Sequence, residues 1–273
     1  GVNRLSIGIQ SFDPAHLKAL GRIHDRDEAL RAVEIVQANF DNFNLDLMYA
    51  LPGQSLEQAL ADIDRAIALA PTHLSAYHLT IEPNTYFHRF PPQVPDDELS
   101  ATMQEAIEAR LAAAGYAHYE TSAFARPGRE CKHNLNYWRF GDYLGIGAGA
   151  HGKISLPTRI FRTMRYKNPR EYMAAALSGQ GAVQEVHDVP PGDLPFEFMM
   201  NALRLREGVE LALFGERTGL PLSALEGALA QAEAKGLVER AGGVVRATAR
   251  GFDFLSDLQA LFLPAVRAEE DAR

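Results

Sequence analysis

Residues 130–153, ECKHNLNYWRFGDYLGIGAGAHGK, hold the chain's only cysteine, its only tryptophan and two of its nine histidines. Thiols and imidazoles bind metals, and glycines let a ligand approach the backbone closely. Cys131 has no second cysteine to act with, so we expect it to be inert. GIGAGA fits a loose G-x-G-x-x-A pattern, but no helix pattern follows, as a dinucleotide site requires. We instead expect an inner strand whose missing side chains leave room for a ligand.

His133 has two interpretations. A neutral imidazole is a good axial ligand of haem iron, and Tyr137 and Trp138 would then cover one face of the macrocycle. His151 is the next candidate ligand. Alternatively, His133 and Asn134 cap a turn and the aromatic pair belongs to the core. The residues alone favour the second interpretation. In either case we expect His133 to lie in a loop.

Two polar side chains, Gln10 and Asp46, lie on the polar sides of successive predicted strands. A buried amide and a buried carboxylate both need hydrogen-bond partners. Either could bind the ribose hydroxyls or an amino group of a ligand, and an internal polar network without a ligand explains them equally well. Arg22 follows the first strand and could form a bidentate pair with a ligand carboxylate, although a lone loop arginine is usually a surface residue.

The elements that position these residues alternate between strand and helix. Strand periodicity occurs in RLSIGIQ, FNLDLMYA and HLSAYHLTI, and helical spacing occurs near residues 25–39, 56–67 and 99–111. This order predicts βαβ units with parallel strands. The aliphatic strand positions, which we expect to face helices, are Leu5, Ile7, Leu45 and Leu47. The positions on the opposite face are Ser6, Gly8, Gln10, Asn44 and Asp46. A fully covered parallel sheet is apolar on both faces, so the polar set favours a partial barrel with a ligand inside over a flat sheet.

Composition excludes several classes of protein. A chain of 273 residues with 47% hydrophobic content can bury a real core. One cysteine excludes an internal disulfide framework. The sequence has no run of about 18 apolar residues, so we expect no membrane span. The net charge of −8 gives no general attraction to nucleic acid or anionic lipid. We therefore predict a cytoplasmic globular protein.

The pattern changes near PPGDLP, where we place a domain boundary between residues 189 and 190. Helical patterns near 194–206, 210–217 and 222–235, a hairpin at 236–248 and a last helix have the outline of a winged helix. Winged helices often bind DNA through cationic groups, whereas these helices are acid-rich. Their acidic residues are Glu207, Glu210, Glu216, Glu226 and Glu233. We expect a packing or substrate-covering role.

Four segments together resemble a known family. GVNRLSIGIQSF, LDLMYALPGQS, YETSAFARPGRECKHNLNYW and GDYLGIGAGAHG are similar to segments of radical S-adenosylmethionine enzymes of the oxygen-independent coproporphyrinogen oxidase family. The resemblance runs nearly end to end. It implies an α/β fold in which residues 1–189 form the C-terminal part of a partial (βα)6 barrel, followed by a small winged-helix-like domain at 190–273. It also implies S-adenosylmethionine inside the barrel and a [4Fe–4S] cluster at its mouth.

The resemblance assigns the polar strand residues to S-adenosylmethionine. Gln10 matches the family's ribose-binding glutamine, and Arg22 matches the arginine that meets the methionine carboxylate. Asp46, in LDLMYALP, matches a further polar residue that contacts this cofactor. These assignments fit the chemistry of the side chains.

The resemblance also concerns haem. HNLNYW matches the H-N-x-x-Y-W signature that separates the haem chaperones of the family from its true oxidases. His133 becomes the leading haem-ligand candidate, with Asn134, Tyr137 and Trp138 beside it and His151 as a second choice.

The sequence departs from the family in one respect. The C-x-x-x-C-x-x-C cluster loop and a glycine-rich methionine-binding strand precede the matched region in the family, and neither occurs here. Cys131 cannot replace three thiolates. We therefore expect these residues to be part of a longer protein, to hold no cluster by themselves and to present an unpaired strand edge.

We accordingly expect the intact protein to be a haem chaperone that binds haem, S-adenosylmethionine and a cluster. It would deliver haem to acceptor proteins, including membrane-associated ones, and would not bind nucleic acid. The alternative is an enzyme of porphyrin biosynthesis that decarboxylates coproporphyrinogen III oxidatively by means of an adenosyl radical. A winged-helix DNA-binding module is a remote alternative, which the acidic balance opposes.

Overall fold

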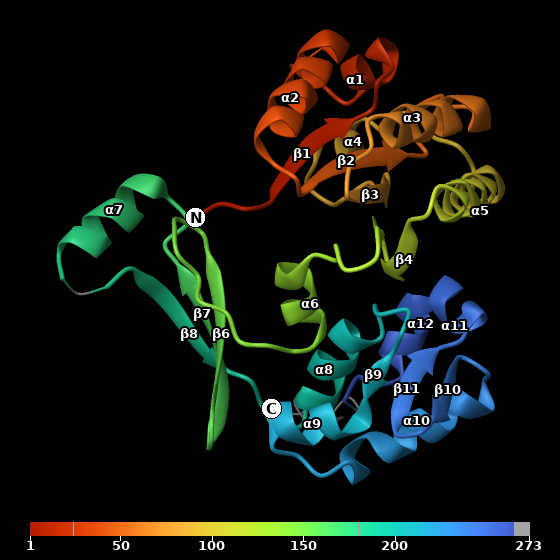
Figure 1. The fold of residues 1–273 in the computed structure, drawn as a ribbon. Coiled ribbons are helices and arrows are strands. Elements are labelled where there is room, and N and C mark those ends of the chain that lie inside the picture. Colours follow the sequence, from red (N-terminus) through yellow and green to blue (C-terminus); the bar gives the residue numbers. More distant parts are fainter. Residues whose placement is uncertain (24, 180, 265–273) are drawn as a thin grey trace. The chain divides into compact units, whose positions relative to one another are not determined.

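The computed structural model describes residues 1–23, 25–179 and 181–264. The chain divides into two compact units, residues 1–130 and a second unit that begins at Cys131 (Figure 1). We expected a division near residue 189. The segment before that residue belongs to the second unit because Ile160 lies in the same buried cluster as Phe198. The boundary at 189 stays a prediction of where two sequence domains meet.

The first unit contains a five-stranded sheet in the order β1-β2-β3-β5-β4. Strands β1 (Leu5–Gln10), β2 (Phe43–Tyr49) and β3 (His73–His78) are parallel, as the sequence predicts. Strand β5 (Ala123–Ala125) pairs antiparallel with β3, and β4 (Ala117–Glu120) pairs antiparallel with β5 at the other edge of the sheet. Strand β1 is therefore an edge strand of this sheet.

The helices of the first unit are α1 (Pro14–Ala19), α2 (Arg26–Asn39), α3 (Leu56–Ala68), α4 (Tyr86–Arg89) and α5 (Asp97–Ala113). Helix α2 begins with a capping box between Asp25 and Glu28. Helix α3 begins with a second one, in which the predicted cap Ser55 pairs with Gln58. Each box satisfies backbone N–H groups that lack an intrahelical partner.

One face of the sheet packs against α2, α3 and α5. Leu45 and Leu47 are fully buried in a cluster with Val33 of α2 and Ile63 of α3, and Leu5 and Ile7 pack at its border. Figure 1 shows α2 and α3 lying along β1 and β2. The predicted direction of the aliphatic positions is confirmed, and the opposite, polar face is left open by these helices.

The second unit begins with α6 (Lys132–Trp138). A three-stranded antiparallel sheet follows, formed by β6 (His151–Leu156), β7 (Arg159–Arg165) and β8 (Val183–Asp188). Helix α7 (Pro169–Leu177) connects β7 to β8. Next come α8 (Leu194–Ala202), β9 (Val209–Glu210), α9 (Leu211–Thr218) and α10 (Ser223–Ala234). Strands β10 (Val238–Ala241) and β11 (Val244–Ala247) form the predicted hairpin. Its turn uses Gly242 and Gly243, both with positive φ.

The end of the described chain differs from the expected single helix. It forms α11 (Ala249–Asp253) and α12 (Leu255–Ala260), which are separated at Phe254, where the backbone leaves helical geometry. The order of helices and hairpin is otherwise that of the predicted winged-helix-like domain. None of the helices in the described ranges combines the length and hydropathy needed to cross a membrane.

Phenylalanines lie at the centre of the second core. Phe198 of α8 contacts Phe140 edge to face, with ring centroids 5.7 Å apart, and Phe214 of α9 with centroids 5.3 Å apart. All three are buried. Such edge-to-face pairs hold rings in fixed relative orientations. They attach the segment after α6 to the helices of the small C-terminal domain.

Candidate functional site

The polar face of the first sheet carries a hydrogen-bonded network around Asp46. Ser6 donates its hydroxyl to Asp46 Oδ2 at 2.8 Å, and Asn44 donates from Nδ2 to Asp46 Oδ1 at 2.8 Å. Ser6 is exposed and Asp46 half-buried. The carboxylate thus lies on the face opposite the helices, as predicted, with both oxygens held by neighbours.

His73 extends this network across β3. Asn44 Oδ1 lies 2.7 Å from His73 Nδ1 and the Tyr119 hydroxyl lies 2.8 Å from Nε2. Because the amide oxygen only accepts, Nδ1 carries the proton and Nε2 accepts from Tyr119. Burial, and secondarily the charge of Arg4, lowers the pKa of His73 to about 3, so this histidine is neutral. His73 was not predicted from the sequence, although its register partner in β2 is Asn44.

Gln10 ends β1 in an unusual conformation. Its φ is +69°, and the register with β2 shifts between Gly8 and Gln10. The side chain folds back so far that a Cβ on Gly8 would lie 2.7 Å from Gln10 Nε2. Gly8 pairs with Asp46 across the strands, on the face that Ser6 shares. The amide of Gln10 and the carboxylate of Asp46 therefore lie on the same side of the sheet.

Arg22 lies in the turn between α1 and α2, and its side chain is exposed. Its backbone N–H donates to the Leu17 carbonyl at 3.0 Å. Among the described residues, no hydrogen bond or ion pair joins Arg22 to Gln10 or Asp46. The structure thus brings two of the three predicted cofactor-binding residues to one face and leaves the third in solvent.

The segment after Gln10 is anchored by a buried carboxylate of α3. Ser11 donates its hydroxyl to Asp62 Oδ2 at 2.6 Å, and the Phe12 N–H donates to Asp62 Oδ1 at 2.8 Å. Burial raises the pKa of Asp62, and the two hydrogen bonds oppose the rise. Asp62 is 5% exposed. Asp62 fixes where the chain leaves β1. The helical pattern of α3 does not predict this role.

The residues of HNLNYW form helix α6 and not a loop, which corrects the expectation for His133. The helix is capped by Cys131, whose side chain makes no capping hydrogen bond, so neither His133 nor Asn134 is the cap. Helical spacing places His133 and Tyr137 on one face, and their ring centroids lie 4.7 Å apart at 86°. His133 is exposed, whereas Tyr137 and Trp138 are half-buried.

Trp138 is packed against a cation. The guanidinium carbon of Arg204 lies 4.2 Å from the centroid of a Trp138 ring. The indole Nε1 is buried and has no hydrogen-bond partner in the part of the chain that the structure describes. Asn134 is half-buried on the same helix. The four signature residues therefore differ, because only His133 presents an exposed, metal-ligating side chain.

His151 begins β6 and is exposed, opposite Met164 of β7. The preceding GIGAGA is a loop, so the expected inner barrel strand is wrong. Backbone fills the space beside the first of its glycines: a Cβ on Gly145 would lie 2.4 Å from the His151 carbonyl oxygen. A Cβ on Gly152 would lie 2.7 Å from Thr163 Oγ1. Gly145 and Gly152 thus permit close packing of the chain on itself.

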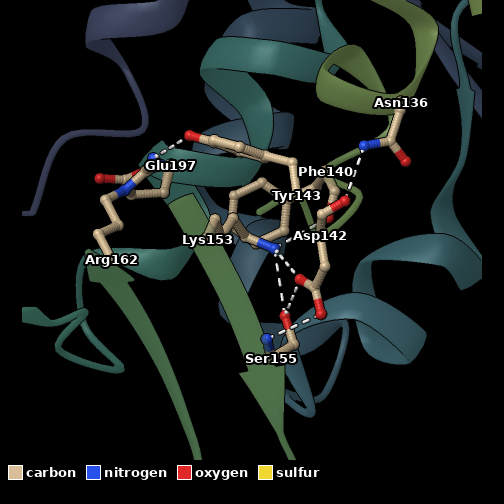
Figure 2. Close-up of polar contacts among 8 residues, drawn as sticks. All are labelled: Asn136, Phe140, Asp142, Tyr143, Lys153, Ser155, Arg162 and Glu197. Atoms are coloured by element: carbon tan, nitrogen blue, oxygen red, sulfur yellow. Dashed lines mark hydrogen bonds and ion pairs between the residues drawn. The ribbon is translucent and has the colours of Figure 1, made fainter. Parts of the chain in front are cut away.

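A buried lysine of β6 was likewise not predicted from the sequence (Figure 2). Lys153 is 2% exposed, and its ammonium donates to the Phe140 carbonyl, to Asp142 Oδ1 and to the Ser155 hydroxyl at 3.1, 3.0 and 3.1 Å. Burial lowers the pKa of Lys153 against the opposing effect of Asp142. For Asp142, hydrogen bonds from Ser155 and Lys153 outweigh the effect of burial, so its pKa lies below the usual range.

The residues that the structure describes contain no ligand set for an iron–sulfur cluster. Within residues 1–23, 25–179 and 181–264, no group of three or more His, Cys, Asp or Glu side chains could hold a metal ion. The single cysteine, Cys131, is buried at the start of α6. A [4Fe–4S] cluster therefore does not fit the residues described.

Comparisons with known proteins identify the family of this chain. Residues 1–66 match the Radical SAM superfamily, and residues 189–254 match the HemN C-terminal domain. The "Heme chaperone HemW" of Escherichia coli is 48% identical over 265 residues, which cover 96% of this chain and 69% of the relative. The protein of the same name from Haemophilus influenzae is 46% identical, and the match covers 96% of this chain and 68% of the relative. The one from Bacillus subtilis is 34% identical, and the match covers 92% of this chain and 67% of the relative.

A solved structure is also similar. "Coproporphyrinogen III oxidase (HemN) from Escherichia coli is a Radical SAM enzyme" superimposes with a TM-score of 0.76 at 19% identity, covering 96% of this chain and 64% of that one. At this identity the likeness shows the fold alone, and it confirms the expected α/β architecture. The sequence relatives show more, because they are similar over nearly the whole chain. The chain belongs to the HemW family of the radical SAM superfamily.

Proposed function

We propose that the intact protein is a haem chaperone, which binds haem and passes it to acceptor proteins. The observation that carries the proposal is the exposed imidazole of His133 on α6, with Tyr137 one turn away at 4.7 Å. An imidazole on a surface helix can ligate haem iron without enclosing the macrocycle. Because a chaperone must release its cargo, an exposed ligand suits transfer better than a deep pocket does.

Trp138 and Asn134, two other residues of the signature, are half-buried on the helix that carries His133. The guanidinium carbon of Arg204 lies 4.2 Å from the centroid of a Trp138 ring. Exposed aliphatic side chains follow in the same segment: Leu144 is 74% and Ile146 83% exposed. Apolar surface of this kind gains free energy when a macrocycle covers it. His151 remains the second candidate ligand.

We propose that S-adenosylmethionine binds at the polar face of the first sheet. Gln10 is proposed to bind the ribose hydroxyls and Asp46 a further polar group, since both lie on the open face. Arg22 is proposed to bind the methionine carboxylate, and its exposed position leaves it free to reach a ligand. The cofactor supplies a reactive sulfonium when bound. No step is assigned to a cluster, since Cys131 is the only cysteine.

Binding to nucleic acid is not supported by the winged-helix-like region. Arg240 of the hairpin donates to both oxygens of Glu226 at 3.0 and 2.9 Å and to Glu233 at 2.8 and 2.6 Å. Arg246 pairs with Glu239. These guanidinium groups are engaged by carboxylates of the same unit, so they are poorly placed to neutralise phosphates. We propose instead that the partners are haem and protein acceptors in the cytoplasm, including membrane-associated ones.

The test compares haem-loaded intact protein with two histidine variants. His133→Ala should shift the Soret band and weaken haem affinity by about tenfold or more, equivalent to about 1.4 kcal/mol, because an iron ligand is lost. The control is His187→Ala, at an exposed histidine of β8 that pairs with Glu185. The control should keep the wild-type spectrum and affinity.

Two results would contradict the proposal at different levels. Wild-type protein that binds no haem would exclude the chaperone function. Wild-type binding with an unchanged Soret band in His133→Ala would exclude His133 as the ligand, and His151→Ala would then be measured in the same way. Transfer is checked by mixing the haem-loaded protein with an apo-globin and following the globin spectrum.

A further inference from the structure

Three aromatic rings follow one another across the start of the second unit. His133 and Tyr137 lie with ring centroids 4.7 Å apart and planes at 86°. Tyr137 and Tyr143 follow with centroids 4.6 Å apart and planes at 78°. Both contacts are edge to face, an arrangement that the ring quadrupoles favour and that restricts rotation of each ring. The orientation of the His133 imidazole thus depends on Tyr137, and that of Tyr137 on Tyr143.

Tyr143 is held by its backbone and by its hydroxyl (Figure 2). Its N–H donates to the Lys153 carbonyl and its carbonyl accepts from the Lys153 N–H, both at 3.0 Å. Its hydroxyl accepts a hydrogen bond from Arg162 Nη1 at 3.3 Å. Arg162 in turn pairs with Glu197 of α8. The last ring of the series is therefore attached to β6, β7 and α8.

The backbone just before Tyr143 is fixed by the buried lysine. The three N–H donors of the Lys153 ammonium are all used, two of them by Phe140 and Asp142. Asn136 of α6 donates from Nδ2 to the Asp142 carbonyl at 2.9 Å. Only the lysine is buried, since the Asp142 side chain is 43% exposed. The hydrogen bonds from the Lys153 ammonium and from Asn136 together define the path from α6 to Tyr143.

Helix α6 depends on such contacts. It has seven residues, and its first turn lacks a side-chain cap. Helices this short are not stable by themselves in water, so tertiary contacts set the direction of their side chains. On the His133 face of α6, Tyr137 contacts Tyr143. It places the imidazole ring plane relative to β6.

We propose that Tyr143 is a positioning residue that orients the His133 imidazole through Tyr137. The inference rests on the proposed haem binding, and it assigns a role outside the HNLNYW signature. The plane of an axial imidazole determines its overlap with the iron orbitals and therefore the electron paramagnetic resonance (EPR) spectrum of ferric haem. A misoriented imidazole still ligates iron but binds haem more weakly.

The first measurement uses the haem-free intact protein. The chemical shifts of the His133 ring protons, measured by NMR, report the ring current of Tyr137 and so the contact itself. Tyr143→Leu removes the third ring, and the shifts should move toward those of a free histidine. Tyr143→Phe keeps the ring and loses only the hydroxyl bond to Arg162, so the shifts should stay close to wild type. Unchanged shifts in Tyr143→Leu would overturn the inference.

The second measurement uses the haem-loaded protein. Tyr143→Leu should keep the Soret band of the histidine-ligated form, change the EPR g-anisotropy and lower haem affinity by about three- to tenfold. Tyr143→Phe should keep the wild-type EPR g-anisotropy and haem affinity. Tyr166→Leu serves as the matched control, because Tyr166 is also half-buried in the second unit. An identical change in this control would mean that general loosening, and not the orientation of His133, is responsible.

The outcomes separate this inference from the proposed function. If His133→Ala shifts the Soret band and Tyr143→Leu changes neither the EPR spectrum nor the haem affinity, haem binding stands and the positioning role is wrong. If His133→Ala leaves the Soret band and the affinity unchanged, the proposed ligand is wrong, and the NMR comparison still decides whether Tyr143 orients His133. Should Tyr143→Leu give a spectrum typical of unfolded protein, Tyr143→Met, which preserves more volume, replaces it in both measurements.

Discussion

His73 is the residue whose charge should link stability to pH in the first unit. Burial and the charge of Arg4 hold its folded-state pKa at about 3, below the ordinary 6.5. Between these values the unfolded chain binds more protons than the folded one, so the free energy of unfolding falls as pH falls from 6.5 to 3. Above pH 6.5 the contribution of neutral His73 to stability is fully present. From pH 7 to pH 5 the loss should be about 2 kcal/mol.

His73→Gln removes this titration and keeps a polar group between Asn44 and Tyr119. Urea unfolding followed by circular dichroism at the two pH values should show a smaller loss in the variant than in wild type. Equal losses in both proteins would mean that His73 titrates normally in the folded chain and that the polar network does not exclude its protonation.

Individual residues were predictable where periodicity determines direction. Asp46 and Leu45 lie on opposite faces because neighbouring strand residues alternate, and the aliphatic positions identified the helix side. Periodicity cannot show the register shift at Gln10 or the positive φ that folds its side chain over Gly8. The sequence also does not show that the carbonyl oxygen of His151, at the start of β6, occupies the space where a side chain at Gly145 would lie.

At the scale of elements, the connection between β1 and α1 depends on one carboxylate of α3. Asp62→Ala leaves the Phe12 N–H and the Ser11 hydroxyl without the acceptor they now use. A lost buried acceptor costs about 1–3 kcal/mol, so the free energy of unfolding should fall by that amount. Hydrogen exchange of the Phe12 amide should also become faster, because the end of β1 is released.

The same helix offers a matched control. Asp64 pairs with Arg110 of α5 at 2.6 Å, but the side chains are 49% and 44% exposed. Exposed ion pairs contribute about 1 kcal/mol or less, so Asp64→Ala should have a small effect in the same unfolding experiment. Equal destabilisation by the two variants would show that burial of Asp62 does not decide its importance.

Elements were predictable in proportion to their length and regularity. Helices α2, α3 and α5 have apolar spacing and capping residues that mark their starts, and each was expected near its observed position. Helix α6 was missed because seven residues show too little periodicity and its signature is polar and aromatic. The break at Phe254 within the last helical pattern lies between two segments that both have helical composition.

At the scale of the molecule, the chain builds two separate cores. One cluster contains Leu45 and Met103 and the other Phe198 and Phe214, in units that divide after residue 130. The sequence places a boundary near 189 because proline and glycine interrupt the pattern there. Local composition cannot show that β6–β8 belong with the later helices, since those contacts join residues distant in sequence, such as Arg162 and Glu197.

The two cores should unfold as distinguishable units. Trp138, the only tryptophan, lies in the second unit, so its fluorescence reports that unit, whereas circular dichroism reports both. Phe214 and Leu45 are each fully buried, one in each core. Phe214→Ala should lower the stability seen by fluorescence by about 3–5 kcal/mol, and Leu45→Ala, which costs about 2–5 kcal/mol, should shift only the transition seen by circular dichroism. If Leu45→Ala displaces the fluorescence transition as far as Phe214→Ala does, the two cores fold as one cooperative unit and the division at residue 130 has no thermodynamic meaning.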